Sequence, residues 1–251
     1  MKQQIHLIMP MGGAGSRFFK NGFVMPKPLI EINEKPFLFW ATKSISNFIE
    51  VKDITFIVLK QHIEEFKIDE KIKEFFPVAK IVIITEILNG AVLTCMNGLK
   101  EINDDLPIIF NDCDHAFISS EFNSYANCGG FDELDGGLLT FESNDPKYSF
   151  LQMDENGNVI HTVEKKAVSN HAICGAYYFK NKDLFLECAN EYLDKCNYSE
   201  YFVSGVYNIM AEKQMKIANF KCDTHVPFGT PDEYYKAKDN EIFRKVIEKQ
   251  I

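Results

Sequence analysis

The residues best suited to chemistry begin near the start of the chain, in a glycine-rich segment followed by two cations. Gly12, Gly13 and Gly15 come directly after a short apolar run, and Arg17 and Lys27 follow them. Glycines let a backbone approach phosphate oxygens closely and turn its N–H groups toward them. Arginine adds a planar fork of donors, and lysine adds a mobile point charge. The segment predicts a polyphosphate-binding loop, with a tight turn between solvated charges as the alternative.

Two common phosphate-binding motifs do not explain this segment. After Gly13 and Gly15 the third glycine of the dinucleotide fingerprint is missing, and the chain contains no Gly-Lys-Ser/Thr of a P-loop. A nucleotide site here would therefore belong to a different class.

Two carboxylates follow a later apolar run at residues 107–110. Asp112 and Asp114 stand just after this predicted strand, where open α/β sheets bind their ligands. Carboxylate oxygens are typical ligands of Mg²⁺. The pair predicts a metal site, with an ordinary loop cap as the alternative.

The pattern of apolar residues predicts the elements that must position these groups. Apolar runs at 5–9, 54–59, 81–84 and 107–110 are typical of strands buried on both faces of a parallel sheet. Helical spacing predicts helices over about 37–48, 63–76 and 91–99 between them. This alternation favours a doubly wound α/β sheet.

The second half of the chain predicts strands of mixed pattern, at 136–141, 150–153, 159–163 and 172–179, with a hairpin turn at 154–158. We therefore expect a single α/β domain over 1–251 with a Rossmann-like doubly wound mixed sheet. Its expected parts are a nucleotide-binding half at 1–115, an acceptor-binding half at 116–240 and the end of a C-terminal helix at 241–251.

Composition excludes several classes of protein. The formal net charge of −9 and the scattered Lys and Arg residues argue against a nucleic-acid surface. The seven cysteines are odd in number and lack a C-x-x-C pair, so free thiols in a reducing cytoplasm are expected. The apolar run at 5–9 is too short for a signal peptide or a membrane span.

Several motifs in order resemble one family, the sugar-phosphate nucleotidyltransferases with a GT-A-like fold. The pattern G-x-G-x-R-F at Gly13 to Phe18, followed by P-K-P-L at Pro26 to Leu29, is its signature. Segments similar to later motifs of the family occur at 86–94, 111–115, 164–179, 199–204 and 228–234. The resemblance spans about residues 5 to 238.

The resemblance implies roles for individual residues. Its catalytic residues would be Arg17, Lys27 and Lys165. Arg17 would also help to bind the nucleotide, together with Met11, Gly12, Gly13, Ala14, Gly15, Ser16, Glu86, Asn89, Gly90 and Asp112. The acceptor would contact Glu164, Lys165, Gly175, Tyr177 and Glu200.

The cofactor implied by the resemblance is Mg²⁺, bound by Asp114, with Asp112 as a second candidate ligand and Asp232 as a third. Two positions depart from the family pattern. Pro227 stands where many members have a second metal-binding Asp, for which Asp223, His225 or Asp232 could substitute, and Lys166 replaces a proline.

The resemblance implies transfer of a nucleoside monophosphate to a phosphorylated small molecule, with release of pyrophosphate. The compact chain and its opening motif are most similar to capsule-pathway members, such as cytidylyltransferases acting on glutamine phosphate. The expected partners are therefore a nucleoside triphosphate, with CTP favoured, and a phosphorylated acceptor. Neither nucleic acid nor a membrane is expected, and a homodimer is a possible assembly.

Three alternatives remain open. The first is a guanylyl- or uridylyltransferase that uses a sugar 1-phosphate. The second is a non-catalytic nucleotide-sugar sensor, which Pro227 permits and which the retained Arg17, Lys27, Asp114 and Lys165 oppose. The third is a glycosyltransferase with Asp112 and Asp114 as its metal motif, which would not need the glycine-rich start.

Overall fold

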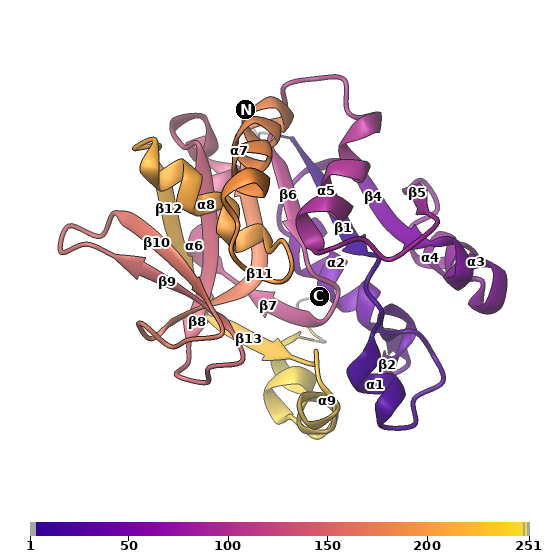
Figure 1. Ribbon diagram of the computed structural model, residues 1–251. Coiled ribbons are helices and arrows are strands. Elements are labelled where there is room, and N and C mark those ends of the chain that lie inside the picture. Colours follow the sequence, from indigo (N-terminus) through magenta and orange to yellow (C-terminus); the bar gives the residue numbers. More distant parts are fainter. Residues whose placement is uncertain (1–3, 248, 250–251) are drawn as a thin grey trace.

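The computed structural model describes residues 4–247 and residue 249, which form a mixed sheet of nine strands with helices on both faces, beside two small two-stranded sheets (Figure 1). The strands are β1 Ile5–Met11, β2 Glu31–Ile32, β3 Lys35–Pro36, β4 Val51–Leu59, β5 Lys80–Ile84, β6 Ile108–Asn111, β7 His115–Ile118, β8 Gly136–Glu142, β9 Ser149–Met153, β10 Val159–Glu164, β11 His171–Phe179, β12 Ile217–Lys221 and β13 Thr224–Pro227. The α-helices are α1 Ser16–Lys20, α2 Phe37–Ser46, α3 Lys60–Phe66, α4 Ile68–Phe75, α5 Ala91–Gly98, α6 Ser120–Asn127, α7 Lys182–Lys195, α8 Val203–Glu212 and α9 Pro231–Lys238. Short helical turns are η1 Lys27–Leu29, η2 Leu99–Glu101, η3 Gly130–Glu133 and η4 Phe243–Ile247.

The first half of the chain builds the parallel part of the sheet. β1 lies between β4 and β6 and is parallel to both, and β5 extends the sheet beyond β4. This confirms the predicted doubly wound arrangement. The expectation that all these strands are buried on both faces is wrong for β5, because it is the last strand on this side and Ile83 is 54% exposed.

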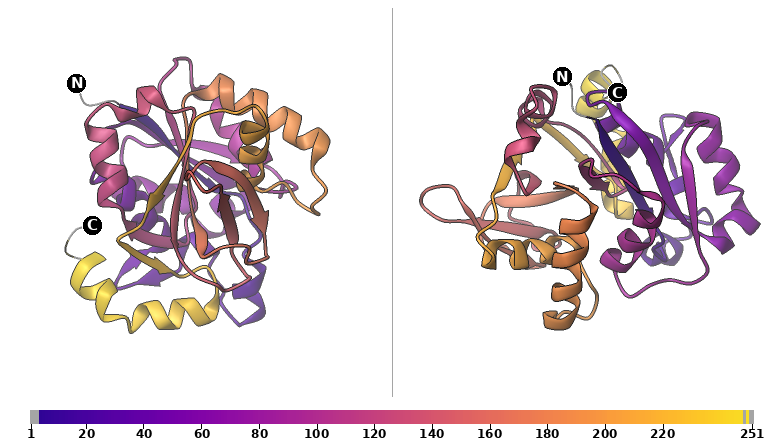
Figure 2. Two further views of the ribbon diagram at one scale, coloured as in Figure 1. Left: turned by 90° about the vertical axis from the view of Figure 1, so that its left-hand side faces the viewer. Right: turned by 90° about the horizontal axis from the view of Figure 1, so that it is seen from above.

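The second half makes the sheet mixed, as predicted. β11 runs antiparallel to β6 and joins the two halves, which lie side by side in Figure 2. β9 and β10 form the predicted hairpin, in which Asp154 N–H donates to the Asn158 carbonyl at 2.9 Å. β12 returns parallel to β8.

Helices cover both faces because side chains alternate along the strands. On β1, Leu7 and Met9 pack toward α2, α4 and α6, whereas Ile8 packs toward α5, α7 and α8. Two buried apolar layers therefore hold the sheet in place.

A third cluster holds the segments that border the carboxyl ends of the parallel strands. It joins α1, α2, β13 and α9 through aromatic rings, with Phe37 against Phe228 at 4.5 Å and against Tyr234 at 5.9 Å between ring centroids. This packing places the segment around Gly229 beside the glycine-rich loop.

One boundary prediction was wrong. The single helix expected over 63–76 is two helices, because Lys67 adopts a left-handed conformation with φ 53° between α3 and α4. The late helix α8 begins at Val203, inside the family-like segment at 199–204, and has no side-chain cap. Of the helix end expected at 241–251, the turn η4 is observed, and residues 248, 250 and 251 lie outside the described residues.

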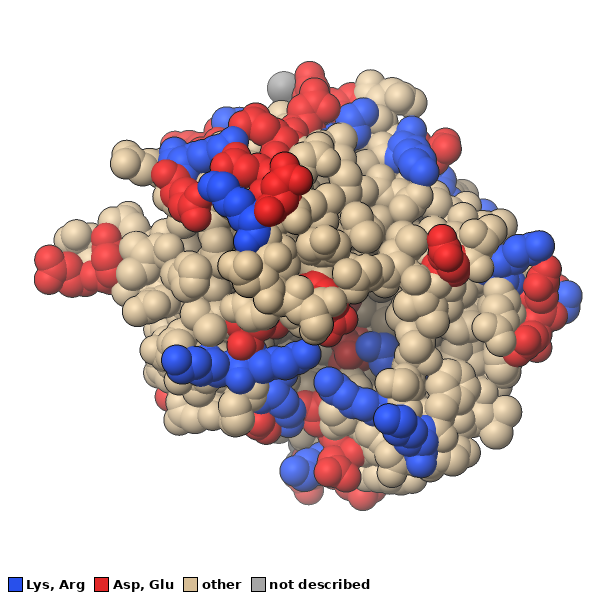
Figure 3. All heavy atoms as spheres, viewed as in Figure 1, with Lys and Arg blue, Asp and Glu red and all other residues tan. Residues whose placement is uncertain are grey.

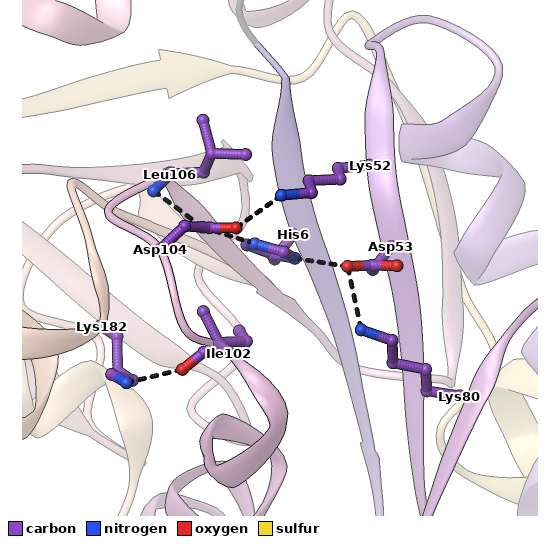
Figure 4. Close-up of polar contacts among 8 residues, drawn as sticks. All are labelled: His6, Lys52, Asp53, Lys80, Ile102, Asp104, Leu106 and Lys182. Carbon is purple, nitrogen blue, oxygen red and sulfur yellow. Dashed lines mark hydrogen bonds and ion pairs between the residues drawn. The ribbon is translucent and has the colours of Figure 1, made fainter.

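A polar network occupies the opposite end of the sheet, at the amino ends of β1 and β4 (Figure 4). His6 lies between two carboxylates, with Nδ1 3.4 Å from Asp53 and Nε2 2.9 Å from Asp104. Lys80 pairs with Asp53 at 3.1 Å, and Lys52 pairs with Asp104 at 2.7 Å. These contacts tie the loop before β6 to the sheet.

All seven cysteines are free thiols, as predicted. Among the residues that the structure describes, no helix is long and apolar enough to cross a membrane.

Candidate active site

Two adjoining cavities lie at the carboxyl ends of the parallel strands. The first, called here the glycine-loop cavity, is lined by residues 10–18, by Lys27 and by the segment around Gly90. The second, called here the β11 cavity, is lined by residues of β9 to β11, β13 and α9. Six residues line both cavities and mark their junction: Arg17, Ala91, Asp112, Asp114, Glu200 and Gly229.

The glycine-rich loop has the room that close approach of a ligand requires. Gly15 adopts φ 61°, a conformation that favours glycine, at the start of α1. A Cβ added at Gly12 would lie 2.4 Å from Ile84 Cδ1, so this position admits glycine alone without rearrangement. A Cβ at Gly13 would meet nothing within 4 Å. Space therefore remains open above the middle of the loop.

Lys27 and Asp114 form an ion pair at the junction. Lys27 Nζ lies 3.0 Å from Asp114 Oδ2, and both side chains are about a quarter exposed, at 28% and 26%. Burial opposes the charged form of Lys27, but the Asp114 carboxylate outweighs it and raises the lysine pKa. The same attraction holds the pKa of Asp114 below its ordinary value despite burial.

The chain turns between the two carboxylates, because β6 ends at Asn111 and β7 begins at His115. Asn111 Nδ2 donates to the Ala41 carbonyl at 2.9 Å, and its Oδ1 lies 2.9 Å from His115 Nε2. These buried contacts fix the turn from below. Asp112 and Asp114 both line the junction as a result.

The positive charge near Asp112 does not offset the burial of its carboxyl and the charge of Asp114. Burial and the neighbouring Asp114 carboxylate raise its pKa to about 7. Gly175, with φ 95°, makes room for it, since a Cβ there would lie 2.7 Å from Asp112 Oδ2. A cation bound between the two aspartates would relieve this repulsion.

The aspartates therefore fit a divalent metal that also binds ligand oxygens. Mg²⁺ commonly uses one or two carboxylates together with waters and substrate phosphates. Among the described residues, no group of three His, Cys, Asp or Glu side chains could hold a metal by itself. Any metal here would depend on oxygens supplied by a ligand.

The β11 cavity brings together the residues predicted to contact an acceptor. Glu164 and Lys165 at the end of β10, Gly175 and Tyr177 on β11, and Glu200 all line it. Glu164 accepts a hydrogen bond from Ser204, and burial raises the pKa of its carboxyl.

The turn after β10, where Lys166 stands in place of a proline, places Lys165 in the β11 cavity. Lys165 adopts φ 54°, and its Nζ lies 3.5 Å from Glu200 Oε1.

Several predicted residues do not reach either cavity. Glu86 and Asn89 are exposed, and their neighbours Ile87 and Leu88 line the glycine-loop cavity instead. Asp232 is exposed on the first turn of α9 and lines neither cavity.

Of the other two residues that could substitute for the missing Asp at position 227, one lines a cavity and one does not. Asp223 accepts a hydrogen bond from Ser120 N–H at 2.7 Å and lines neither cavity. His225 lines the β11 cavity, but neither ring nitrogen has a hydrogen-bond partner among the described residues. Burial holds its pKa well below the usual range, so the ring is neutral.

Sequence reasoning missed Lys147, Tyr148 and Glu233, which line the β11 cavity. One signal for Glu233 was present, because Thr230-x-x-Glu233 has the spacing of a capping box. Lys147 and Tyr148 lie on the β8–β9 loop and carry no motif among those recognised in the sequence.

The charge around the cavities is mixed rather than uniformly positive. Figure 3 shows Lys and Arg side chains beside Asp and Glu side chains around the hollow on this face. Because the chain as a whole carries a net charge of −9, these local cations are what a phosphate ligand would meet.

Comparisons with solved structures support the fold. A nucleoside-diphosphate-sugar pyrophosphorylase from Vibrio cholerae has a TM-score of 0.78 at 23% identity, covering 92% of this chain and 98% of that one. The inositol-1-phosphate CTP transferase from T. maritima has a TM-score of 0.76 at 13% identity, covering 100% of this chain and 97% of that one.

Sequence comparisons also cover nearly the whole chain. A D-glycero-alpha-D-manno-heptose 1-phosphate guanylyltransferase from Campylobacter jejuni is 25% identical over 241 residues, which are 91% of this chain and 96% of that protein. Residues 6–242 match the Nucleotidyl transferase family. The chain therefore belongs to the nucleotidyl transferase family.

Proposed function

We propose that this protein transfers the nucleoside monophosphate of a nucleoside triphosphate onto a phosphorylated small-molecule acceptor and releases pyrophosphate. The observation that carries the proposal is the meeting of two cavities at Arg17, Asp112 and Asp114. One cavity has a glycine-rich wall suited to a triphosphate, and the other has a lysine and carboxylates suited to a second substrate. Their junction is where a phosphate of each substrate would meet.

In this reaction an acceptor phosphate oxygen attacks the α-phosphorus in line, its new P–O bond forms, and the bond to the pyrophosphate oxygen breaks. A phosphate dianion is already a competent nucleophile, so no general base is required. Catalysis then rests on alignment and on stabilising the negative charge that develops. Cations placed at the junction serve both needs.

On the nucleotide side, the backbone of residues 12–16 and Arg17 would bind the β- and γ-phosphates. Lys27 would contact the α-phosphate and the acceptor phosphate. Gly90 and its neighbours would border the nucleoside. The nucleotide would then be bound mainly by residues of 1–115, with Glu200 and Gly229 added from the second half.

Asp114 and Asp112 would hold Mg²⁺, which when bound would neutralise charge on the phosphates. Lys27 would then give up part of its contact with Asp114 and contact phosphate oxygens, because the carboxylate and the phosphates compete for the same ammonium group. On the acceptor side, Lys165 would hold the acceptor phosphate, and Glu164, Glu200, Gly175 and Tyr177 would contact the rest of the acceptor.

We further propose CTP as the nucleotide and a phosphorylated amino acid such as L-glutamine phosphate as the acceptor, in capsule or surface-polysaccharide biosynthesis. The opening motif at 10–18 and the segment at 111–115 support this choice by resemblance. The main alternative is a sugar 1-phosphate with GTP or UTP, favoured by the guanylyltransferase from Campylobacter jejuni.

The test is pyrophosphate release with Mg²⁺ across CTP, UTP, GTP and ATP, each paired with sugar 1-phosphates and phosphorylated amino acids including glutamine phosphate. Release that requires one triphosphate and one acceptor together supports the proposal and identifies both substrates. Tight nucleotide binding without release from any pair would instead favour a nucleotide-sugar sensor.

A further inference from the structure

Three of the side chains that line the β11 cavity but not the glycine-loop cavity come from two segments far apart in the chain. Lys147 and Tyr148 lie on the loop between β8 and β9, and Glu233 lies in the first turn of α9. None of them lies at the junction of the two cavities. We call Lys147, Tyr148 and Glu233, together with Asp145, the loop–helix clasp.

Glu233 is the centre of the clasp and is only 7% exposed. Its Oε1 accepts a hydrogen bond from the Tyr148 hydroxyl at 2.6 Å and lies 3.0 Å from Lys147 Nζ. Its Oε2 accepts from Thr230 Oγ1 at 3.1 Å, and its backbone N–H donates to the same hydroxyl oxygen at 3.3 Å. A carboxylate held this firmly fixes the positions of the side chains that it contacts.

Lys147 is fully occupied within the clasp. Its Nζ lies 2.9 Å from Asp145 and 3.0 Å from Glu233, and it stands 4.8 Å from the centroid of the Tyr148 ring. Burial opposes its charge, but the hydrogen bonds to both carboxylates prevail and raise its pKa. Lys147 is therefore already paired when an acceptor arrives, with Glu233, which lines the β11 cavity, and with Asp145, which is 48% exposed and lines neither cavity.

The remaining cations of the β11 cavity are engaged elsewhere. Lys165 Nζ lies 3.5 Å from Glu200, and Arg17 lies at the junction of the cavities. In the proposed function Lys165 holds the acceptor phosphate, and Arg17 binds the triphosphate. A second anionic group directed at the clasp would find Lys147 already paired and would meet the Glu233 carboxylate in a partly desolvated place, where repulsion is stronger than in bulk water.

We propose, building on the proposed function, that the loop–helix clasp forms the acceptor-binding wall and selects against acceptors that carry a second anionic group facing it. Glu233 acts as a positioning residue through Lys147 and Tyr148, and Tyr148 presents its ring and hydroxyl oxygen to the acceptor. The part of the acceptor that reaches this wall is neutral or cationic.

Two substitutions change the charge of the clasp in opposite directions. Glu233→Gln removes the clasp's carboxylate from the cavity wall, and glutamine keeps the capping-box geometry and an oxygen that can accept from Tyr148. Lys147→Met keeps a long apolar stem and removes the cation that neutralises Glu233. The matched control is Lys180→Met, because Lys180 pairs with Asp135 at 3.2 Å and lines neither cavity.

The experiment measures kcat/KM for two acceptors, with the triphosphate that the wild-type enzyme uses. One is the best acceptor found by pyrophosphate release, and the other is its analogue with one added phosphate or carboxylate remote from the reacting phosphate. For a hexose 1-phosphate, that analogue is the 1,6-bisphosphate. KM for the triphosphate and the melting temperature are measured for every variant.

We expect the wild-type enzyme to prefer the acceptor without the added charge. Glu233→Gln should lower this preference about fivefold and Lys147→Met should raise it about fivefold, as a unit change of charge at intermediate dielectric implies. KM for the triphosphate should stay within about twofold, and Lys180→Met should change neither quantity.

Shifts of the preference in the same direction for both clasp variants, or no shift in either, would overturn the proposal while leaving the proposed function intact. Parallel rises in both KM values with a lower melting temperature would also overturn it, because they would show a purely structural role. Silence of the wild-type enzyme on every substrate pair would instead overturn the proposed function, and this proposal with it.

Discussion

Replacing Lys27 by alanine is the sharpest perturbation of the junction between the cavities. The substitution removes the ammonium group that lies 3.0 Å from Asp114 and leaves Asp112 and Asp114 facing each other. Since burial and Asp114 already raise the pKa of Asp112 to about 7, loss of the nearby cation must raise it further. The site loses a positive charge where negative charge develops during transfer.

The expected effect on rate is larger than the effect on stability. Removing one group that stabilises developing charge typically lowers kcat by about 10²- to 10³-fold. Breaking a fully buried ion pair costs about 3–5 kcal/mol, but these side chains are 28% and 26% exposed, so about 1–2 kcal/mol is the expected loss of folding stability. KM for the triphosphate should rise much less than kcat falls.

Pyrophosphate release measures kcat and KM, and urea unfolding measures stability. Lys180→Ala is the matched control, because it also removes a lysine from an aspartate pair but lines neither cavity. A Lys27→Ala enzyme with nearly normal kcat would refute the reasoning. So would an equal loss of kcat in the control.

Three further changes test other parts of the structure. Gly175→Ala should lower the free energy of unfolding by about 1–3 kcal/mol, because the residue has φ 95° and its new Cβ would lie 2.7 Å from Asp112 Oδ2. The unfolding free energy measured in urea and kcat should both decrease. An unchanged kcat would contradict the proposed role of Asp112. Burial opposes ionisation of Asp104, but hydrogen bonds from Lys52 and His6 outweigh it and lower its pKa. The stability that Asp104 contributes is present above about pH 4 and is lost as the pH falls through its lowered folded pKa. In Asp104→Asn, the free energy of unfolding should therefore depend less steeply on pH in the acid range. An unchanged slope would contradict this. Tyr207→Phe removes the hydroxyl that contacts the carbonyls of Gly137 at 2.8 Å and Tyr178 at 2.7 Å. Thermal unfolding should show a free energy of unfolding lower by about 1–3 kcal/mol, and kcat should be normal. An unchanged melting temperature would be inconsistent with these contacts.

The fold could be predicted from the sequence wherever one strong local signal decided the structure. Apolar runs located β1, β4 and β6, and the Asn-Gly turn located the β9–β10 hairpin. The break at Lys67 could not be predicted, because a lysine in a left-handed conformation leaves no pattern in composition. The edge position of β5 depends on strand order, which apolar content does not encode.

Some parts of the candidate site could likewise be predicted from local sequence signals, and others could not. The glycine-rich loop and the two aspartates could be located because each follows a strand directly, and Lys27 because it belongs to the P-K-P-L motif. The loop–helix clasp could not, because Lys147 and Glu233 meet only after two distant segments fold together. The position of Asp232, exposed beside the inward-facing Glu233, shows that helical phase decides which of two neighbouring carboxylates reaches a cavity.

The most direct test of the central claim is identification of the phosphorus products by ³¹P NMR, with the wild-type enzyme, Mg²⁺, one triphosphate and one phosphorylated acceptor. Transfer at the junction of the two cavities predicts one new diphosphate linkage between nucleoside and acceptor for each pyrophosphate released. Release of a nucleoside diphosphate or of orthophosphate, or binding of both substrates without any new linkage, would contradict the account.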